Sequence, residues 1–313
     1  MAAAKKVDRS PPATAKGFPI LRAALRLIFG PGRPVVIVLF LIGLLMGACF
    51  LVWQSVRDRV LADPRYWLKA ADVEITPVPE WIHSDVRGDV IRGITLDSSM
   101  SIMDEQLTQR IADAFGLHPW VAKVVAVRKF HPARLKVDLE YRRPVLMVEV
   151  PGGLLPVDVQ GAWLPSGDFS PIEAAGYPRL VGINSVPVGP VGTRWGDARV
   201  LGAAEIAAAI GSSNWTSLKL QRIMASTPWI TNAGEEFTYE ITTRGGTRVL
   251  WGRSPGASSP GEVPAADKVA RLKQYAAEHS GLDGPHGPQV LDVRSLRRLE
   301  VRPAETKPTP AAG

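Results

Sequence analysis

The sequence predicts an α+β protein that is anchored by a single N-terminal membrane helix. Three observations support this class. An uncharged apolar run covers Val35–Trp53, a strand–helix–helix–strand–strand pattern follows between residues 71 and 143, and short strand patterns separated by glycine turns continue to residue 302. Glycine and proline are frequent, with 29 and 27 residues, and they favour many turns and a sheet-rich body.

The apolar run is long enough to cross a bilayer. It contains 19 residues without a charge, and a helix needs about 17–25 residues to span the hydrocarbon core. We therefore predict a transmembrane helix over residues 34–56 and a juxtamembrane linker over residues 57–70. A cleaved signal peptide would have a shorter apolar core. Met46–Cys49 faintly resembles a lipoprotein processing site, but apolar residues follow Cys49, so a retained anchor is the preferred interpretation.

Positive charge is concentrated before the apolar run. Residues 1–33 have a net charge of +6, which leaves +1 of the total of +7 for the other 280 residues. The positive-inside rule places this basic arm in the cytoplasm and the C-terminal part beyond the inner membrane. A nearly neutral exported part gives no support for nucleic-acid binding. The single cysteine, Cys49, lies in the apolar run, so the exported part cannot form a disulfide.

The first exported module, residues 71–143, begins with a strand at Ala71–Thr76 and two helices at Glu80–Ile91 and Met103–Phe115. Ser101 and Asp104 resemble a capping box for the second helix. Its spacing predicts one buried face made of Met103, Leu107, Ile111 and Phe115.

Two strands complete this module, at Val121–Lys129 and Arg134–Tyr141. Alternation predicts that one face of the first strand carries Val121, Val125 and Val127. In the second strand it predicts an inward face of Leu135, Val137, Leu139 and Tyr141. The expected product is a small sheet covered by two helices.

The second region, residues 144–302, is predicted to form a mixed or antiparallel sheet with helices. Helices are expected at residues 197–211 and 265–279, and Gly245–Gly246 is expected to close a hairpin. Strands are expected at residues 145–150, 154–159, 163–164, 218–225, 236–243, 247–252, 289–294 and 297–302. Residues 303–313 are rich in proline and alanine and are predicted to be a disordered tail.

No convincing catalytic constellation is present in the sequence. Gly252–Gly256 matches G-x-S-x-G, but Pro255 follows Ser254 and has no N–H for an oxyanion hole. The histidines lack metal-ligand spacing, and Asp158 and Asp168 stand in turn-like sequence near glycine. We therefore predict a binding or scaffolding protein that is not an enzyme and that uses no cofactor or metal.

Several motifs follow one another in an order typical of one bacterial family. The motifs are His118–Val121, Arg128–Pro132, Glu140–Pro144, Val157–Gly161, Pro178–Gly182 and Val290–Arg294. In this order they resemble the FtsQ/DivIB family of cell-division proteins, in which a POTRA module precedes a C-terminal β-domain. The resemblance covers Ala71–Arg302, together with the basic arm and the single anchor.

The resemblance implies a scaffold protein of the divisome that crosses the inner membrane once and works in the periplasm at the septum. The POTRA-like module, residues 71–143, would contact other division proteins. The β-domain, residues 144–302, would add a strand from an FtsB-like coiled-coil membrane protein that is paired with an FtsL-like one.

The candidate edge for strand addition is Gln289–Arg302. Apolar residues there would supply side-chain pockets, and arginines would pair with an acidic partner. The predicted partner-binding residues are Val293, Arg294, Ser295, Leu296, Arg297, Arg298 and Leu299. The alternative for this segment is a covered strand with solvated arginines.

Two other functions stay open at this point. A POTRA-bearing component of envelope secretion or assembly would bind an outer-membrane barrel or an unfolded substrate. A membrane-tethered enzyme would depend on Ser254 or Asp158.

Overall fold

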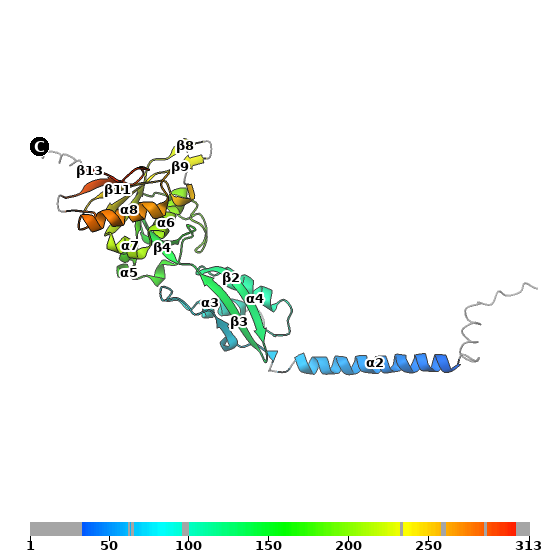
Figure 1. The fold of residues 1–313 in the computed structure, drawn as a ribbon. Helices are drawn as coiled ribbons and strands as arrows, with labels where there is room; N and C mark the ends of the chain where they lie inside the picture. Colours follow the sequence, from blue (N-terminus) through cyan, green and yellow to red (C-terminus); the bar gives the residue numbers. More distant parts are fainter. Residues whose placement is uncertain are drawn as a thin grey trace, which may run out of the picture. The chain divides into compact units, whose positions relative to one another are not determined.

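The computed structural model describes residues 33–61, 63, 66–95, 100–231, 234–257, 261–284 and 287–304. The predicted cytoplasmic arm and C-terminal tail lie outside these residues, apart from Arg33 and residues 303–304. The chain divides into two compact units, Met1–Tyr66 and Trp67–Gly313 (Figure 1). Its helices and its large mixed sheet confirm the α+β class.

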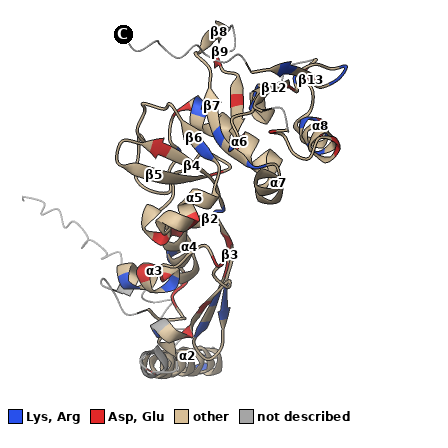
Figure 2. Cartoon of the chain, turned by 90° about the vertical axis from the view of Figure 1, so that its left-hand side faces the viewer, with Lys and Arg blue, Asp and Glu red and all other residues tan. Residues whose placement is uncertain are grey.

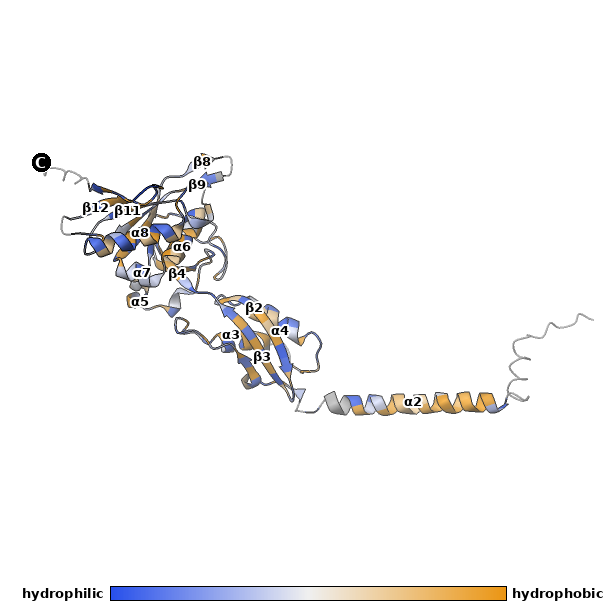
Figure 3. Ribbon diagram, viewed as in Figure 1, coloured by the Kyte–Doolittle hydropathy of each residue, from blue (hydrophilic) through white to orange (hydrophobic). Residues whose placement is uncertain are grey.

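The first unit contains helix α2 (Arg33–Leu61). By length and composition, its segment Arg33–Arg57 qualifies as a membrane span, and no other described helix does. The 29 residues of α2 extend over about 43 Å at the usual rise per residue, whereas the hydrocarbon core measures about 30 Å. Figure 3 shows where the apolar residues of α2 give way to polar ones towards its C-terminal end.

The second unit begins with a three-stranded sheet and two helices. After the short η2 (Ala70–Asp72), the elements follow in the order β1 (Val73–Ile75), α3 (Val86–Thr95), α4 (Leu107–Gly116), β2 (Val121–Phe130) and β3 (Arg134–Tyr141). Strand β3 lies in the centre, parallel to β1 and antiparallel to β2. Their core contains sixteen buried residues, among them Trp120 and Phe115.

Both helices begin later than the sequence pattern predicts. Helix α3 begins at Val86 rather than Glu80, because Trp81 turns away to donate its indole N–H to the Arg142 carbonyl at 3.1 Å. The predicted capping box is wrong. The Ser101 hydroxyl accepts from the Met103 N–H, α4 begins at Leu107, and Met103 is 52% exposed. The remaining residues of the predicted face are fully buried, namely Leu107, Ile111 and Phe115.

The face prediction for β2 is wrong at one of its three residues, since Val125 is 53% exposed. Val121 is buried and Val127 packs against the core, as predicted. The pairing of β2 with β3 shifts between Val121 and Lys123 and again between Val124 and Ala126. Each shift turns the strand, so Val124 packs against the core in place of Val125. Strand β3 alternates as predicted, with Leu135, Val137 and Leu139 buried.

The large sheet has eight strands in the order β13-β12-β11-β10-β7-β6-β4-β5. These are β4 (Pro144–Val150), β5 (Gly153–Asp158), β6 (Arg179–Val181), β7 (Leu220–Ala225), β10 (Tyr239–Thr243), β11 (Arg248–Gly252), β12 (Gln289–Asp292) and β13 (Glu300–Pro303). The pairs β4/β6, β6/β7 and β11/β12 are parallel. The predicted strand at residues 163–164 forms only an isolated bridge between Trp163 and Val157.

Further elements surround this sheet. Strands β8 (Trp229–Thr231) and β9 (Gly234–Glu236) form a separate hairpin. The helices are α5 (Pro171–Gly176), α6 (Ala198–Ile210), α7 (Ser212–Ser217) and α8 (Ala265–Glu278), with the short η3 (Ser166–Asp168) and η4 (Pro255–Ala257). The predicted ends of α6 are confirmed, because Asp197 caps the first turn and Gly211 follows the last residue with φ of 77°.

The main core lies on one face of the large sheet. Leu180, Ile223 and Leu291 of the sheet form one buried cluster with Ile206 of α6 and Leu272 of α8. Figure 1 shows α6, α7 and α8 together on this side of the strands. Helix α6 approaches β10 closely, since Gly202 faces the Tyr239 ring.

We predict that Gly202→Ala destabilises the protein although alanine favours helices. A Cβ atom at residue 202 would lie 2.1 Å from the Tyr239 Oη and 2.8 Å from its Cζ. Overpacking costs about 1–3 kcal/mol and exceeds the helix propensity gain of about 1 kcal/mol. We expect the melting temperature to fall by about 2–6 °C. Gly176→Ala is the matched control, because its Cβ would meet nothing within 4 Å, and an equal effect of both substitutions would contradict the prediction.

Candidate functional site

The outer strand β13 is an open edge of the large sheet among the described residues. It pairs with β12 on one side only, with Leu291 opposite Val301. The Ala304 N–H donates to the Pro288 carbonyl. Because hydrogen-bonded and non-bonded pairs alternate in an antiparallel ladder, the backbone N–H and C=O of Val301 point away from β12, towards a strand that could be added.

Pro303 is consistent with this arrangement. It occupies the other outward position of β13, and a proline without N–H is tolerated at the edge of a sheet. The Val301 side chain is 45% exposed. Strand β13 therefore offers the main-chain groups of a short acceptor strand.

Two other outer strands, β5 and β2, are covered or irregular. At β5, the Asp158 N–H donates to the Ala162 carbonyl, and the Leu164 N–H donates to the Pro156 carbonyl. Strand β2 of the small sheet is interrupted by two register shifts, and shifts of this kind protect an edge from pairing. Strand β13 is thus the regular free edge in the described part of the large sheet.

The predicted partner-binding residues do not form an edge strand, and this prediction of their structure is wrong. Strand β12 ends at Asp292, and residues 293–299 form the connection to β13. Strand β12 cannot accept a partner strand, because β11 and β13 flank it on both sides. The connection leaves the ladder because Val293 is fully buried in the core and Arg271 of α8 donates to the carbonyls of Ser295 and Leu296.

Arg294 is engaged within the chain. Its Nε lies 2.8 Å from Asp292 Oδ1, and a second hydrogen bond joins its Nη2 to Oδ2. The hydrogen bond from Arg294 holds the pKa of Asp292 below its ordinary value, although burial opposes this shift. The carboxylate in turn raises the pKa of Arg294 through the same hydrogen bond. Arg294 is therefore not available as a free cation for a partner.

The remaining predicted residues are more accessible. Arg297 and Arg298 are exposed, and neither has an ion pair with a described residue. Leu296 is 63% exposed, whereas Leu299 is partly buried against the core. The connection thus presents two cations and one apolar side chain beside β13.

The residues that the prediction missed are Val301 and Pro303. Val301 belongs to a predicted strand, but the partner-binding set stops at Leu299. Pro303 falls in the predicted disordered tail, and that prediction is wrong at this residue, because Pro303 ends β13. Proline at the end of a strand pattern is the signal that would have marked the outer strand, because a strand paired on both sides needs its N–H groups.

The catalytic leads from the sequence do not come together. Ser254 is buried and lies between β11 and the short 3₁₀ helix η4, not at a turn from a strand into an α-helix. Asp158 is bonded to Arg142, with Oδ2 and Nη1 2.6 Å apart. Asp168 accepts from the indole N–H of Trp120 at 2.6 Å. The described residues contain no group of three His, Cys, Asp or Glu that could hold a metal ion.

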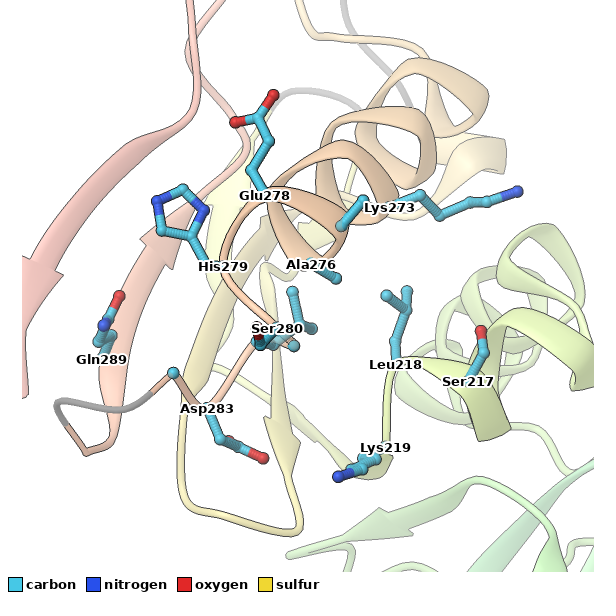
Figure 4. A pocket seen from close by; sticks show the side chains of 14 residues that line it. Ser217, Leu218, Lys219, Lys273, Ala276, Glu278, His279, Ser280, Asp283 and Gln289 are labelled. Atoms are coloured by element: carbon cyan, nitrogen blue, oxygen red, sulfur yellow. The ribbon is translucent and has the colours of Figure 1, made fainter.

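A groove of about 950 Å³ lies beside β12, between the ends of α7 and α8 (Figure 4). Lys273 and Lys219 come from opposite walls, with Leu218 between them. Asp283 in this groove is bonded to the Thr243 hydroxyl, and His279 stacks on Tyr275 with ring centroids 4.0 Å apart. These side chains serve internal contacts and do not form a nucleophile with a base.

No protein-family model matches the chain, and none of the curated proteins compared with it matches either.

Proposed function

We propose that this protein is a scaffold that crosses the membrane once and binds an extended partner segment by strand addition to β13. The observation that carries the proposal is the outward N–H and C=O of Val301 on an outer strand that no described residue covers. Unpaired main-chain groups at a sheet edge bind extended peptides through further ladder bonds.

We further propose that the protein works in bacterial cell division, as a member of the FtsQ/DivIB family. The element order β1-α3-α4-β2-β3 supports a POTRA-like module, and the motifs of the sequence occur in the family's order. Helix α2 supports a single inner-membrane anchor. The charge of the N-terminal arm favours a cytoplasmic N-terminus and a periplasmic body.

The proposed partner is an FtsB-like coiled-coil protein paired with an FtsL-like one. Its segment would pair with Val301, and its acidic residues would meet Arg297 and Arg298. These two arginines are exposed, so they steer and orient the partner more than they add affinity. The POTRA-like module is proposed to contact further division proteins.

We predict that Val301→Pro abolishes partner binding and leaves the fold intact. The proline removes an outward N–H, and the ladder with β12 does not use that N–H. Loss of this bond and the added ring should weaken binding by more than about tenfold. The measurement is co-purification of the full chain from membranes with its FtsB- and FtsL-like partners, together with mid-cell localisation.

Val301→Thr is the matched control, because it keeps the backbone N–H and a β-branched side chain. Unchanged circular dichroism and melting temperature of both variants would show that the sheet is preserved. Full binding by the proline variant would overturn strand addition. An outer-membrane barrel in place of the coiled-coil pair would favour the secretion or assembly function.

A further inference from the structure

The face of the large sheet opposite its helices carries a row of arginines. Leu180 and Ile223 point into the main core, so their neighbours Arg179 and Arg222 point to the other face, because side chains alternate along a strand. The register places Arg179 opposite Arg222, Arg222 opposite Thr242, and Thr242 opposite Arg248. Figure 2 shows basic positions on β6 and β7.

Two of these arginines lack a counter-charge among the described residues. Arg248 is paired with Glu240 through two bonds of 2.6 Å, and Arg302 of β13 is paired with Glu300 at 2.9 Å. No described carboxylate forms an ion pair with Arg179 or Arg222. Like charges opposite each other on neighbouring strands are destabilising. The protein without a partner therefore keeps an unfavourable pair of like charges at Arg179 and Arg222.

The next row has apolar side chains on β6 and β7, and it carries the carboxylates of Glu240, Asp292 and Glu300 further along. Val181 pairs with Met224, Met224 pairs with Glu240, and Glu240 pairs with Leu250. Met224 is 43% exposed, and Val181 and Leu250 are partly exposed. Arg179 and Arg222 beside Val181 and Met224 favour a protein segment over a free anion, because an inorganic anion gains nothing from the apolar side chains.

The strand directions support the same conclusion. Strands β4, β6 and β7 are parallel neighbours, and parallel sheets are usually covered on both faces. Here the buried cluster with α6, α7 and α8 covers one face. On the other face Met147 of β4, which pairs with Arg179, is buried, whereas Arg222 and Met224 of β7 are exposed.

We propose that this face binds an acidic amphipathic helix of a protein partner. Neighbouring strands are about 4.8 Å apart, and side chains one helical turn apart are separated by about 5–6 Å. Two carboxylates at positions i and i+4 of a helix therefore match Arg179 and Arg222, and the apolar residues of the helix would pack on Met224 and Val181. The site is separate from the edge of β13, so it does not depend on strand addition.

The first test measures the free protein. Arg222→Gln should raise the melting temperature of the full chain in detergent by about 1–3 °C, because it removes the repulsion. Arg248→Gln is the matched control in the same row, and it should lower the melting temperature, because it breaks the pair with Glu240. A fall with Arg222→Gln like that of the control would overturn the inference.

The second test identifies what covers the face. The photo-crosslinking residue p-benzoylphenylalanine replaces Met224 in the full chain, and Thr242 in a second variant, in cells of the source organism. We expect crosslinks to a helical segment with carboxylates three or four residues apart. Arg179→Glu with Arg222→Glu should reduce the yield at least about tenfold, and Arg248→Glu less than about twofold.

Three results would overturn the proposal in this test. They are crosslinks to lipid or glycan alone, crosslinks to a segment without such carboxylates, and the absence of crosslinks from both positions. An unchanged yield in the double variant would overturn it as well. Val301→Pro separates the two sites, because it should leave these crosslinks intact even where it abolishes strand addition.

Discussion

Replacing Asp158 by alanine is expected to lower the free energy of unfolding by about 3–5 kcal/mol. Asp158 and Arg142 form a pair with 5% and 16% of their side chains exposed. The carboxylate also accepts the N–H groups of Gln160 and Ala162, each at 2.9 Å. The substitution leaves a guanidinium buried without its counter-charge, and Arg142 Nε already has no partner.

The measurement is thermal unfolding of the full chain, with an expected fall of roughly 6–15 °C in melting temperature. Asp138→Ala is the matched control. Its pair with Arg128 has the same distance of 2.6 Å, but the Arg128 side chain is 59% exposed, so its loss should cost no more than about 1 kcal/mol. Equal losses in the two variants would contradict the role assigned to burial.

Asp158→Asn separates charge from hydrogen bonding. Asparagine keeps an oxygen that can accept the two backbone N–H groups, so this variant should lose less than the alanine variant. Arg142→Gln combined with Asp158→Asn should then be less destabilising than the sum of the single changes, because no unpaired charge remains. Additive losses would show that the pair is not coupled.

Replacing Asp168 by alanine is expected to cost about 2–3 kcal/mol and to loosen the small sheet from the large one. Asp168 follows β5 in the sequence, but its carboxylate accepts from Trp120 at 2.6 Å and from the Ser84 hydroxyl at 3.0 Å. Both donors belong to the small module. The Trp120 side chain is fully buried, so its indole N–H would lose its partner away from water.

Two residues near Asp168 also connect the segment after β5 with the small module. Leu164 is buried in the core of the small module, and Phe169 packs against that core. The segment around η3 therefore belongs to the large-sheet region in sequence and to the small module in packing. We expect Asp168→Ala to weaken the attachment of this segment to the small module more than the loss of any single exposed contact would.

Loosening of the small sheet from the large one is measured by the distance between spin labels at Lys136 and Arg244, in a chain with Cys49→Ala. Both labelled positions are exposed. The distance distribution should be narrow in the parent chain and broader with Asp168→Ala. Asp113→Ala, which removes an exposed hydrogen bond with Gln109, is the control and should leave it narrow. A narrow distribution in both variants would show that Asp168 contributes only local stability.

Local sequence patterns were sufficient to predict much of the fold. The alternation of Arg134–Tyr141, the cap at Asp197 and the glycine turn before β11 depend on neighbours in the sequence, and all three are found as predicted. The start of α4 and the inward face of β2 were not predictable in this way. Lys129 donates to the Asp104 carbonyl, and register shifts with β3 turn β2.

The roles of several charged residues also depend on partners that are distant in the sequence. Asp158 and Asp168 stand in turn-like sequence near glycine, but their partners Arg142 and Trp120 are 16 and 48 positions away. Lys268 is another example. It lies on a predicted helix, yet its side chain is 2% exposed, 2.7 Å from Glu262 and 5.2 Å from the centre of the Trp251 ring. Helical periodicity alone gives no reason to bury a lysine.

The sequence alone determined the α+β class, the apolar span and most strand positions, since these depend on hydrophobicity, charge and turn residues that are close together in the chain. Only the tertiary structure decided that Val293 enters the core, that β13 is the outer strand and that Arg179 faces Arg222. Strand order and register depend on pairing between distant segments, and a strand's own residues do not encode its neighbours.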